Sequence, residues 1–411
     1  MDSPQVLAQR HRCVSIGTSF FAGSCLLALT VCSTALAPGG RTRAGQSPIK
    51  AEIHRTFPLT KFYDTPRPLP AGEPGELIRK EEFEGYDLPP AVVAIRFLYH
   101  SRSAGGEDVA TSGLILYPDS NAPAGGWPVI AWAHDLNGVA RQCAPSLARN
   151  LPHAPFLAMY LNLGYAIVAT DYTGLGTNFP SAFADMQSNA ADIIYSVSAA
   201  RAALPQLGPR WITIGIGEGG LAAVAVAEME GELRDPNYLG AIVVSGMEDL
   251  RDRYERPAVS PLLFLAYGIK TLYPDFNITG MLTDQALHLY ARIEQTCGDI
   301  TGTRLSASEM LKADWEDNRR VKEYLDRNHP GETRAFGPLL VIASESDPAV
   351  PISKVSGTLA RMCKRGDLVQ FQTYGEADSG SVIGVSVRDQ MNWIQARFAG
   401  RPASSNCSDV R

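Results

Sequence analysis

The sequence lacks an excess of basic residues, and it lacks any C-x-x-C pair. Its 37 Lys and Arg are outnumbered by 43 Asp and Glu, which gives a net charge of −6. Without a positive surplus to neutralise phosphates, we expect no nucleic-acid partner. Without paired cysteines a zinc site is disfavoured, and we expect no metal and no cofactor. What is present, 45% hydrophobic and 19% charged residues, is typical of a globular protein.

The N-terminus has a stretch without any charged side chain, residues 13–37, which follows a basic segment at residues 10–12. This stretch ends in an Ala-Leu-Ala cleavage pattern, so it predicts a signal peptide at residues 1–37 and a secreted or extracytoplasmic protein. Pro38 is unfavourable directly after a cut, which points to a cut elsewhere, and an uncleaved membrane anchor is the alternative. We expect a linker at residues 38–58, where Gly, Pro, Arg and Ser accumulate.

Three of the seven cysteines lie within the predicted signal peptide. The other four are Cys143, Cys297, Cys363 and Cys407. An even number of cysteines in an exported protein suggests two disulfides. Four cysteines allow three pairings, and their positions alone do not choose among them. Four buried thiols are the alternative.

Short apolar runs alternate with segments of helical periodicity along most of the chain. The apolar runs lie at residues 129–133, 165–170, 211–216, 241–245, 339–343 and 368–374. The helical segments lie at residues 155–162, 186–204, 219–230, 353–365 and 384–398. This order predicts an α/β fold in which a mostly parallel central sheet carries helices on both faces.

Two further segments depart from this alternation. Residues 92–99 and 109–117 alternate apolar and polar side chains around a turn-rich spacer, which predicts a β-hairpin. Residues from about 250 to 335 contain prolines and helical segments but no strong buried strand. We expect them to form a helical cap inserted into one domain that spans residues 59–411.

The segment Gly215-Ile216-Gly217-Glu218-Gly219 joins a predicted strand to a predicted helix. A strand, a sharp G-x-S-x-G turn and a helix form the nucleophile elbow of an α/β-hydrolase, with the serine held at the turn. Here the two flanking glycines are kept, but the central residue is Gly217, which has no side chain. The sequence therefore predicts the α/β-hydrolase fold with no nucleophile in its usual place.

The other two members of a catalytic triad should follow in the order Asp, then His. Asp347 follows the apolar run 339–343 in a D-P-x-V-P loop, a usual place for the triad acid. The base should follow the next strand, but residues 374–381 contain no histidine, and every histidine lies at or before His329. The sequence thus keeps the acid position and lacks the base.

The loop that would form the oxyanion hole follows residues 129–133 and begins His134-Asp135. Asp135 stands where glycine is common, and Glu218 lies beside the elbow amide that would hold an oxyanion. A carboxylate at this place repels developing negative charge, although Glu218 also suits a helix N-terminus. His134 is either a substitute base or a structural residue of the loop.

Several motifs together resemble the secretory lipase family of α/β-hydrolases. They are Ala131-Trp132-Ala133-His134, Cys143-Ala144-Pro145-Ser146, Ala169 to Gly176, the elbow, the Asp347 loop, Asp389 to Trp393 and the tail from Pro402 to Cys407. The resemblance runs from about residue 59 to the C-terminus. It implies that Gly217 replaces the nucleophilic serine and that Ser379, after Asp378, replaces the histidine base. It also implies the pairs Cys143–Cys297 and Cys363–Cys407.

From these residues we expect a secreted lipase homologue that is silent in the Ser-His-Asp mode and binds an apolar or acyl-ester small molecule as a monomer. Leu262, Phe264 and Tyr267 of the cap are candidates for lining the ligand site, with core packing as their alternative role. One alternative function is an active lipase or carboxylesterase that uses other groups, such as Ser379, Ser381 or His134 with Asp135. Another is an extracellular structural or interaction protein.

Overall fold

The structure is a computed structural model that describes residues 56–247, 249–251, 259–298, 305–347, 350–375, 377 and 380–410. Residues 46–411 belong to one compact unit. The predicted signal peptide, almost all of the predicted linker, and Ser379 lie outside the described residues.

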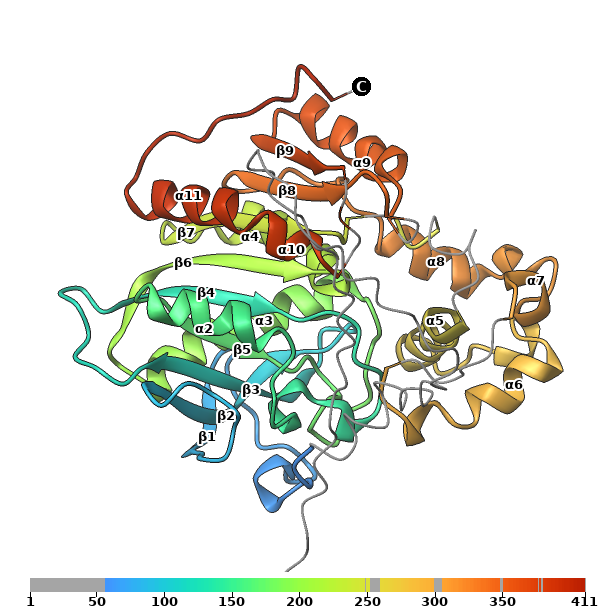
Figure 1. Cartoon of the computed structure of the whole chain (residues 1–411). Helices are drawn as coiled ribbons and strands as arrows, with labels where there is room; N and C mark the ends of the chain where they lie inside the picture. Colours follow the sequence, from blue (N-terminus) through green and yellow to red (C-terminus); the bar gives the residue numbers. More distant parts are fainter. Residues whose placement is uncertain are drawn as a thin grey trace, which may run out of the picture. The chain divides into compact units, whose positions relative to one another are not determined.

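A nine-stranded sheet runs through this unit in the order β1-β2-β3-β5-β4-β6-β7-β8-β9 (Figure 1). The strands are β1 Leu77–Glu82, β2 Val92–Arg102, β3 Asp108–Pro118, β4 Trp127–Ala133, β5 Ala166–Thr170, β6 Leu207–Ile216, β7 Tyr238–Val244, β8 Leu339–Ser344 and β9 Val369–Tyr374. The pairs β1–β2, β2–β3 and β3–β5 are antiparallel, and the other pairs in the sheet are parallel. The predicted hairpin is confirmed as β2 and β3. The apolar pattern of the sequence does not indicate β1, because most residues of this strand are charged.

Helices cover both faces of the sheet, as predicted. They are α2 Ala154–Asn162, α3 Met186–Ala203, α4 Glu218–Leu233, α9 Ile352–Arg365, α10 Val382–Val385 and α11 Val387–Phe398. Alternate residues of each strand enter two separate cores. Val129 and Ala131 of β4 pack in the core that contains residues of α3, α4 and α9. Ile130 and Trp132 pack in the core that contains residues of α2, α10 and α11. Because both faces of a central strand are buried in this way, its residues form a continuous apolar run in the sequence.

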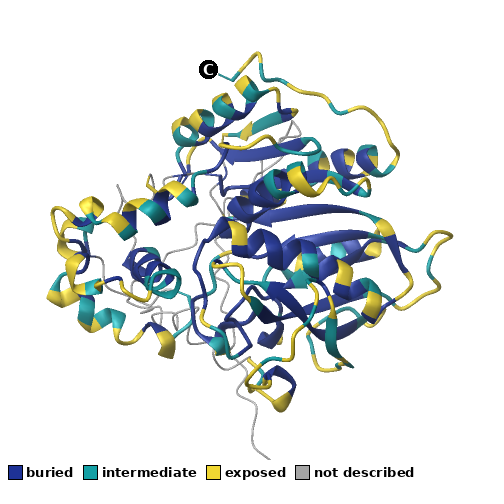
Figure 2. Ribbon diagram, turned by 180° about the vertical axis from the view of Figure 1, so that it is seen from behind, coloured by how far each residue is buried: buried dark blue, intermediate teal, exposed yellow. Residues whose placement is uncertain are grey.

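A group of helices lies in the chain between β7 and β8: α5 Val259–Leu272, α6 Asp284–Tyr290, α7 Ala307–Met310 and α8 Arg319–Arg327. Short 3-10 helices lie at Lys61–Tyr63, Arg141–Cys143, Pro145–Leu147, Ile278–Gly280, Ile293–Gln295 and Trp315–Asp317. Nine of the fourteen residues of α5 are buried and none is exposed, whereas the neighbouring helices carry exposed residues (Figure 2). Arg327 at the end of α8 pairs with buried Asp185, the N-cap of α3, at 2.6 Å between Nε and Oδ2. None of the described helices has both the length and the apolar character needed to span a membrane.

Both disulfide pairings implied by the resemblance are confirmed. Cys143–Cys297 joins the loop after β4 to the segment that precedes α7, and it closes a sequence separation of 154 residues. Cys363–Cys407 joins α9 to the C-terminal tail, with a separation of 44 residues. Each bridge therefore ties a segment outside the sheet to the sheet-bearing part of the chain.

Candidate functional site

The elbow keeps the backbone of a nucleophile turn. β6 ends at Ile216, α4 begins at Glu218, and Gly217 between them has φ 55° and ψ −118°. Few residues with a side chain adopt these angles, and such strain is typical of active-site turns. Close packing also demands small residues here, because a Cβ on Gly219 would lie 2.0 Å from the Ala133 carbonyl oxygen. The turn is therefore built as in an active hydrolase but presents no nucleophile.

The space of the missing nucleophile is filled by the side chain of Asp135. A Cβ atom on Gly217 would lie 1.9 Å from Asp135 Oδ1 and 2.4 Å from its Cγ. Asp135 comes from the loop after β4, and β4 pairs directly with β6 through Ala133 and Gly215. This pairing brings the loop carboxylate to the end of the neighbouring strand. A side chain at position 217 and the present position of Asp135 exclude each other.

Asp135 also occupies the oxyanion hole. Its Oδ1 accepts hydrogen bonds from the backbone amides of Leu136 at 2.7 Å and Glu218 at 3.0 Å. An amide directly after the nucleophile and an amide from the neighbouring loop are the donors that hold the oxyanion in α/β-hydrolases. The chain thus places its own negative oxygen where a reacting ester would place one.

Glu218 faces a different partner from the one we expected. Its Oε1 accepts from the Ala184 amide at 2.9 Å and lies 3.4 Å from Asn189 Nδ2, and its side chain is buried. The side chain therefore ties the start of α4 to the start of α3. The carboxylate that opposes an oxyanion is that of Asp135, and Glu218 contributes its backbone amide.

His134 is held in a structural arrangement. Its Nδ1 lies 2.7 Å from the Asp135 carbonyl oxygen, and its Nε2 lies 3.1 Å from the Asp171 carbonyl oxygen. Its ring packs against Tyr172, with the centroids 4.2 Å apart. Because both ring nitrogens face backbone oxygens, the geometry does not favour His134 as a base that activates water.

His153 is a neighbour of this site that was not among the residues predicted from the sequence. It precedes α2 with φ 60°, and its ring lies 5.9 Å from that of Trp132. Burial lowers the pKa of His153, while the Asp135 carboxylate acts in the opposite direction. A lowered pKa keeps the imidazole of His153 neutral at pH 7. No sequence signal marks this residue, because its position beside Asp135 follows from the fold.

Two buried carboxylates anchor the loop after β5. Asp171 accepts from Ser112 Oγ at 2.6 Å and from the amide and hydroxyl of Ser146 at 2.8 and 2.5 Å, and burial raises its pKa. Asp192 of α3 accepts from the Thr173 amide at 2.7 Å, and burial raises its pKa to about 6. These contacts explain the Asp171–Gly176 motif as a structural element of the fold.

Of the remaining candidates, Asp347 lies three residues after β8 and is buried. Leu262 and Phe264 are fully buried members of the core, and the Phe264 ring lies 5.7 Å from that of Phe183. Tyr267 is partly buried and donates its hydroxyl to Glu294 Oε1 at 2.8 Å. Within the described ranges, no three His, Cys, Asp or Glu side chains are grouped so as to hold a metal ion.

Several known proteins are similar to this chain in sequence or in fold. A probable inactive lipase of Mycobacterium tuberculosis is 22% identical over 373 residues, which cover 84% of this chain and 83% of the relative. Lipase 6 of Candida albicans is 23% identical over 397 residues, which cover 84% of this chain and 82% of the relative. The fold matches Candida antarctica lipase A in its closed state with a TM-score of 0.72 at 16% identity, over 84% of this chain and 88% of that one. It also matches the cell wall degrading esterase LipA of Xanthomonas oryzae with a TM-score of 0.64 at 18% identity, over 80% and 98%.

The model of the secretory lipase family matches residues 153–406, which is more than half of the sequence. The matched part contains the elbow, the Asp347 loop and Cys363 of the second disulfide, and it ends one residue before Cys407. With its α/β-hydrolase fold, the chain belongs to the secretory lipase family.

Proposed function

We propose that this protein is a secreted lipase homologue that does not hydrolyse esters by the Ser-His-Asp route. One observation carries the proposal. Asp135 Oδ1 accepts hydrogen bonds from both oxyanion-hole amides and occupies the space of the absent nucleophile. Gly217 and Ser379, at the positions implied for nucleophile and base, support the same conclusion. In a well-studied serine hydrolase, loss of the nucleophile or of the base alone lowers turnover on the order of 10⁶-fold.

Asp135 adds a block that is separate from the missing nucleophile. An ester can react only when its carbonyl oxygen reaches the amides of Leu136 and Glu218, because these donors stabilise the tetrahedral intermediate. The Asp135 carboxylate excludes that oxygen by volume and opposes its developing charge. Supplying a nucleophile and a base without removing Asp135 should therefore leave the site inactive.

For a bound ligand, we propose that an apolar or acyl molecule contacts Tyr267 and Leu272 near the surface of α5. Both side chains are partly buried against the core. Leu262 and Phe264 support core packing, because neither retains more than 1% of its accessible surface. An extracellular structural role would leave this surface without a ligand.

The decisive experiment compares hydrolysis of p-nitrophenyl butyrate and octanoate by four purified proteins that begin after residue 37. These are the parent, the Gly217→Ser/Ser379→His variant, the same variant with Asp135→Gly, and that triple variant with Asp347→Ala. We expect no turnover above background in the parent or the double variant. We expect measurable turnover in the triple variant and its loss on Asp347→Ala.

Hydrolysis by the parent that Asp347→Ala abolishes would contradict the proposal. Equal activity of the double and triple variants would show that Asp135 does not block the site.

A further inference from the structure

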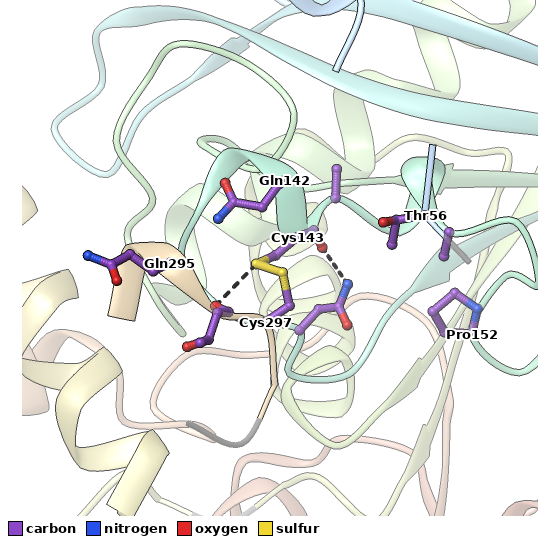
Figure 3. Close-up of a pocket in the computed structure, with 10 residues that line it drawn as sticks. Thr56, Gln142, Cys143, Pro152, Gln295 and Cys297 are labelled. Atoms are coloured by element: carbon purple, nitrogen blue, oxygen red, sulfur yellow. Dashed lines mark hydrogen bonds between the residues drawn. A yellow bond between two sulfur atoms is a disulfide. The ribbon is translucent and has the colours of Figure 1, made fainter. Parts of the chain in front are cut away.

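The two disulfides hold different kinds of structure. Cys143–Cys297 joins two walls of a pocket of about 130 Å³ (Figure 3). Cys363–Cys407 instead holds the C-terminal tail, which leaves the end of α11 and returns to α9 (Figure 1). Residues 401–406 of this tail form neither helix nor strand. The second bridge therefore fixes a segment that has no regular structure of its own to hold it.

The C-terminal tail lies along the free edge of β9, the last strand of the sheet. The carbonyl groups of Leu368 and Tyr374 accept hydrogen bonds from the β8 side. Backbone groups of successive residues in a strand point to opposite edges, so Val369, Phe371 and Thr373 turn theirs away from β8. These three residues form the edge that a further strand would use.

A single residue of the tail, Asn406, bonds to this edge as a neighbouring strand would. Its backbone amide donates to the Val369 carbonyl oxygen at 3.0 Å. Its side-chain Oδ1 accepts from the Phe371 amide at 2.7 Å, and its Nδ2 donates to the Phe371 carbonyl oxygen at 2.9 Å. The side-chain amide of Asn406 thus replaces the peptide group of a pairing strand. Cys407, directly after it, is held by the bridge.

The composition of β9 explains why its edge needs a cover. β1, at the opposite edge of the sheet, reads Leu-Ile-Arg-Lys-Glu-Glu, and charges of this kind discourage pairing with another chain. β9 reads Val-Gln-Phe-Gln-Thr-Tyr, which contains no charged residue, no proline and no glycine. Exposed six-residue segments of this type are prone to pair with copies of themselves. Leu368, just before β9, is 49% exposed and adds apolar surface at the start of the strand.

We propose that the C-terminal tail covers a surface on β9 that otherwise binds the β9 strand of a second copy of this chain. Two copies related by a twofold axis pair these strands antiparallel, because each strand presents the same row of donors and acceptors. No like charges would oppose each other across the axis. The inference goes beyond the proposed function, since it concerns neither the elbow nor ester hydrolysis.

The bridge Cys363–Cys407 keeps this cover in place. It shortens the tether on Asn406 to a single residue, which raises the effective concentration of the tail at the edge above that of a second copy. Disulfides of this kind form in oxidising compartments. A chain that lacks the bridge should therefore uncover β9 and associate.

The test measures the mass of chains that begin after residue 37, by light scattering after size exclusion at increasing concentration. We expect the parent to be a monomer. Asn406→Ala with Cys363→Ser and Cys407→Ser should double the mass, and Asn406→Ala alone should do so only at higher concentration. Thr373→Lys, at an exposed position of β9, should restore the monomer when it is added to the triple variant, because it places like charges on the paired edge.

Cys143→Ser/Cys297→Ser is the matched control, because it removes a disulfide without releasing the tail, and it should stay monomeric. Hydrogen exchange locates the association, since residues 369–374 should exchange more slowly in the associated triple variant than after Thr373→Lys. Thermal unfolding checks that each variant is folded, and Asn406→Ala alone carries the test if the triple variant loses its fold.

Three results would overturn the proposal. They are a folded variant with an uncovered edge that stays monomeric at every concentration, a doubled mass that Thr373→Lys leaves unchanged, and association without slower exchange in β9.

Discussion

At the scale of single residues, Gly217 and Asp135 form a matched pair. The sequence predicted each substitution separately, since both stand at motif positions. Their contact was not predictable from residue order, because β5 separates β4 from β6 in the chain while the sheet places β4 and β6 side by side. For the same reason the role of Glu218 was assigned to its side chain, although its backbone amide is the group that faces Asp135.

Gly217→Ser should destabilise the fold, because the new side chain displaces the Asp135 carboxylate from both amides. We expect a loss of about 1–3 kcal/mol in the free energy of unfolding, measured by chemical denaturation. Gly366→Ser is the control, since Gly366 also has a positive φ of 85° but open space around it. In an Asp135→Gly background, the cost of Gly217→Ser should fall, although the strained angles of Gly217 should keep it above that of the control.

The prediction fails if Gly217→Ser costs the same with and without Asp135.

At the scale of elements, the spacing of apolar residues in the sequence was enough to locate the central strands and most helices of the sheet layers. It failed where side-chain character was ambiguous. β1 reads as a charged segment because it pairs on one side only, with β2. α5 is apolar on nearly all sides, so the sequence could not separate core positions such as Leu262 and Phe264 from ligand-lining positions.

Glu228 gives α4 a pH-dependent contact with the segment before β8. Its Oε1 accepts from the Gly331 amide at 2.7 Å, and burial raises the pKa of Glu228 from 4.5 to about 7. The folded state therefore holds a proton that the unfolded state releases, so stability should fall as the pH rises from 4.5 to about 7. Glu228→Gln keeps the acceptor oxygen and should remove this decline, which amounts to about 3 kcal/mol.

Denaturant unfolding at pH 5 and pH 8 measures this decline in both proteins. Glu232→Gln, at an exposed position of the same helix, is the control and should keep the parental pH dependence. If Glu228→Gln kept the parental decline of stability with pH, that decline would belong to another group.

At the scale of the whole molecule, the order of strands and helices was sufficient to predict the fold class. The motifs then placed the chain beside the secretory lipases. The disulfide pairing came from that resemblance, because four cysteines spread over the sequence from Cys143 to Cys407 carry no spacing rule of their own. What the sequence could not supply was spatial: the strand order, the filled oxyanion hole, and the pocket beside Cys143–Cys297.

The two disulfides should contribute unequally to stability. In the chain-entropy model, the separations of 154 and 44 residues make the Cys143–Cys297 bridge more stabilising by about 1 kcal/mol. We therefore expect Cys143→Ser/Cys297→Ser to lower the unfolding midpoint more than Cys363→Ser/Cys407→Ser. Equal midpoints of the two variants in calorimetry would contradict this expectation.

Export should remove the segment before the linker. In a host with a secretory pathway, we predict that the chain is recovered outside the cytoplasm with an N-terminus that follows residues 1–37 or lies close to that point. N-terminal sequencing of the recovered protein measures the cut. A full-length chain that stays with the membrane fraction would instead support the uncleaved anchor.

The carboxylate held on the amides of Leu136 and Glu218 has a consequence for how such proteins are found. Chemical surveys of serine hydrolases rely on fluorophosphonates that label an activated serine, and their phosphoryl oxygen settles on the same two donors. Position 217 offers nothing to label, and Asp135 already covers the donors. A fluorophosphonate survey of secreted proteins would therefore not detect this chain. A classification by fold would group it with the enzymes.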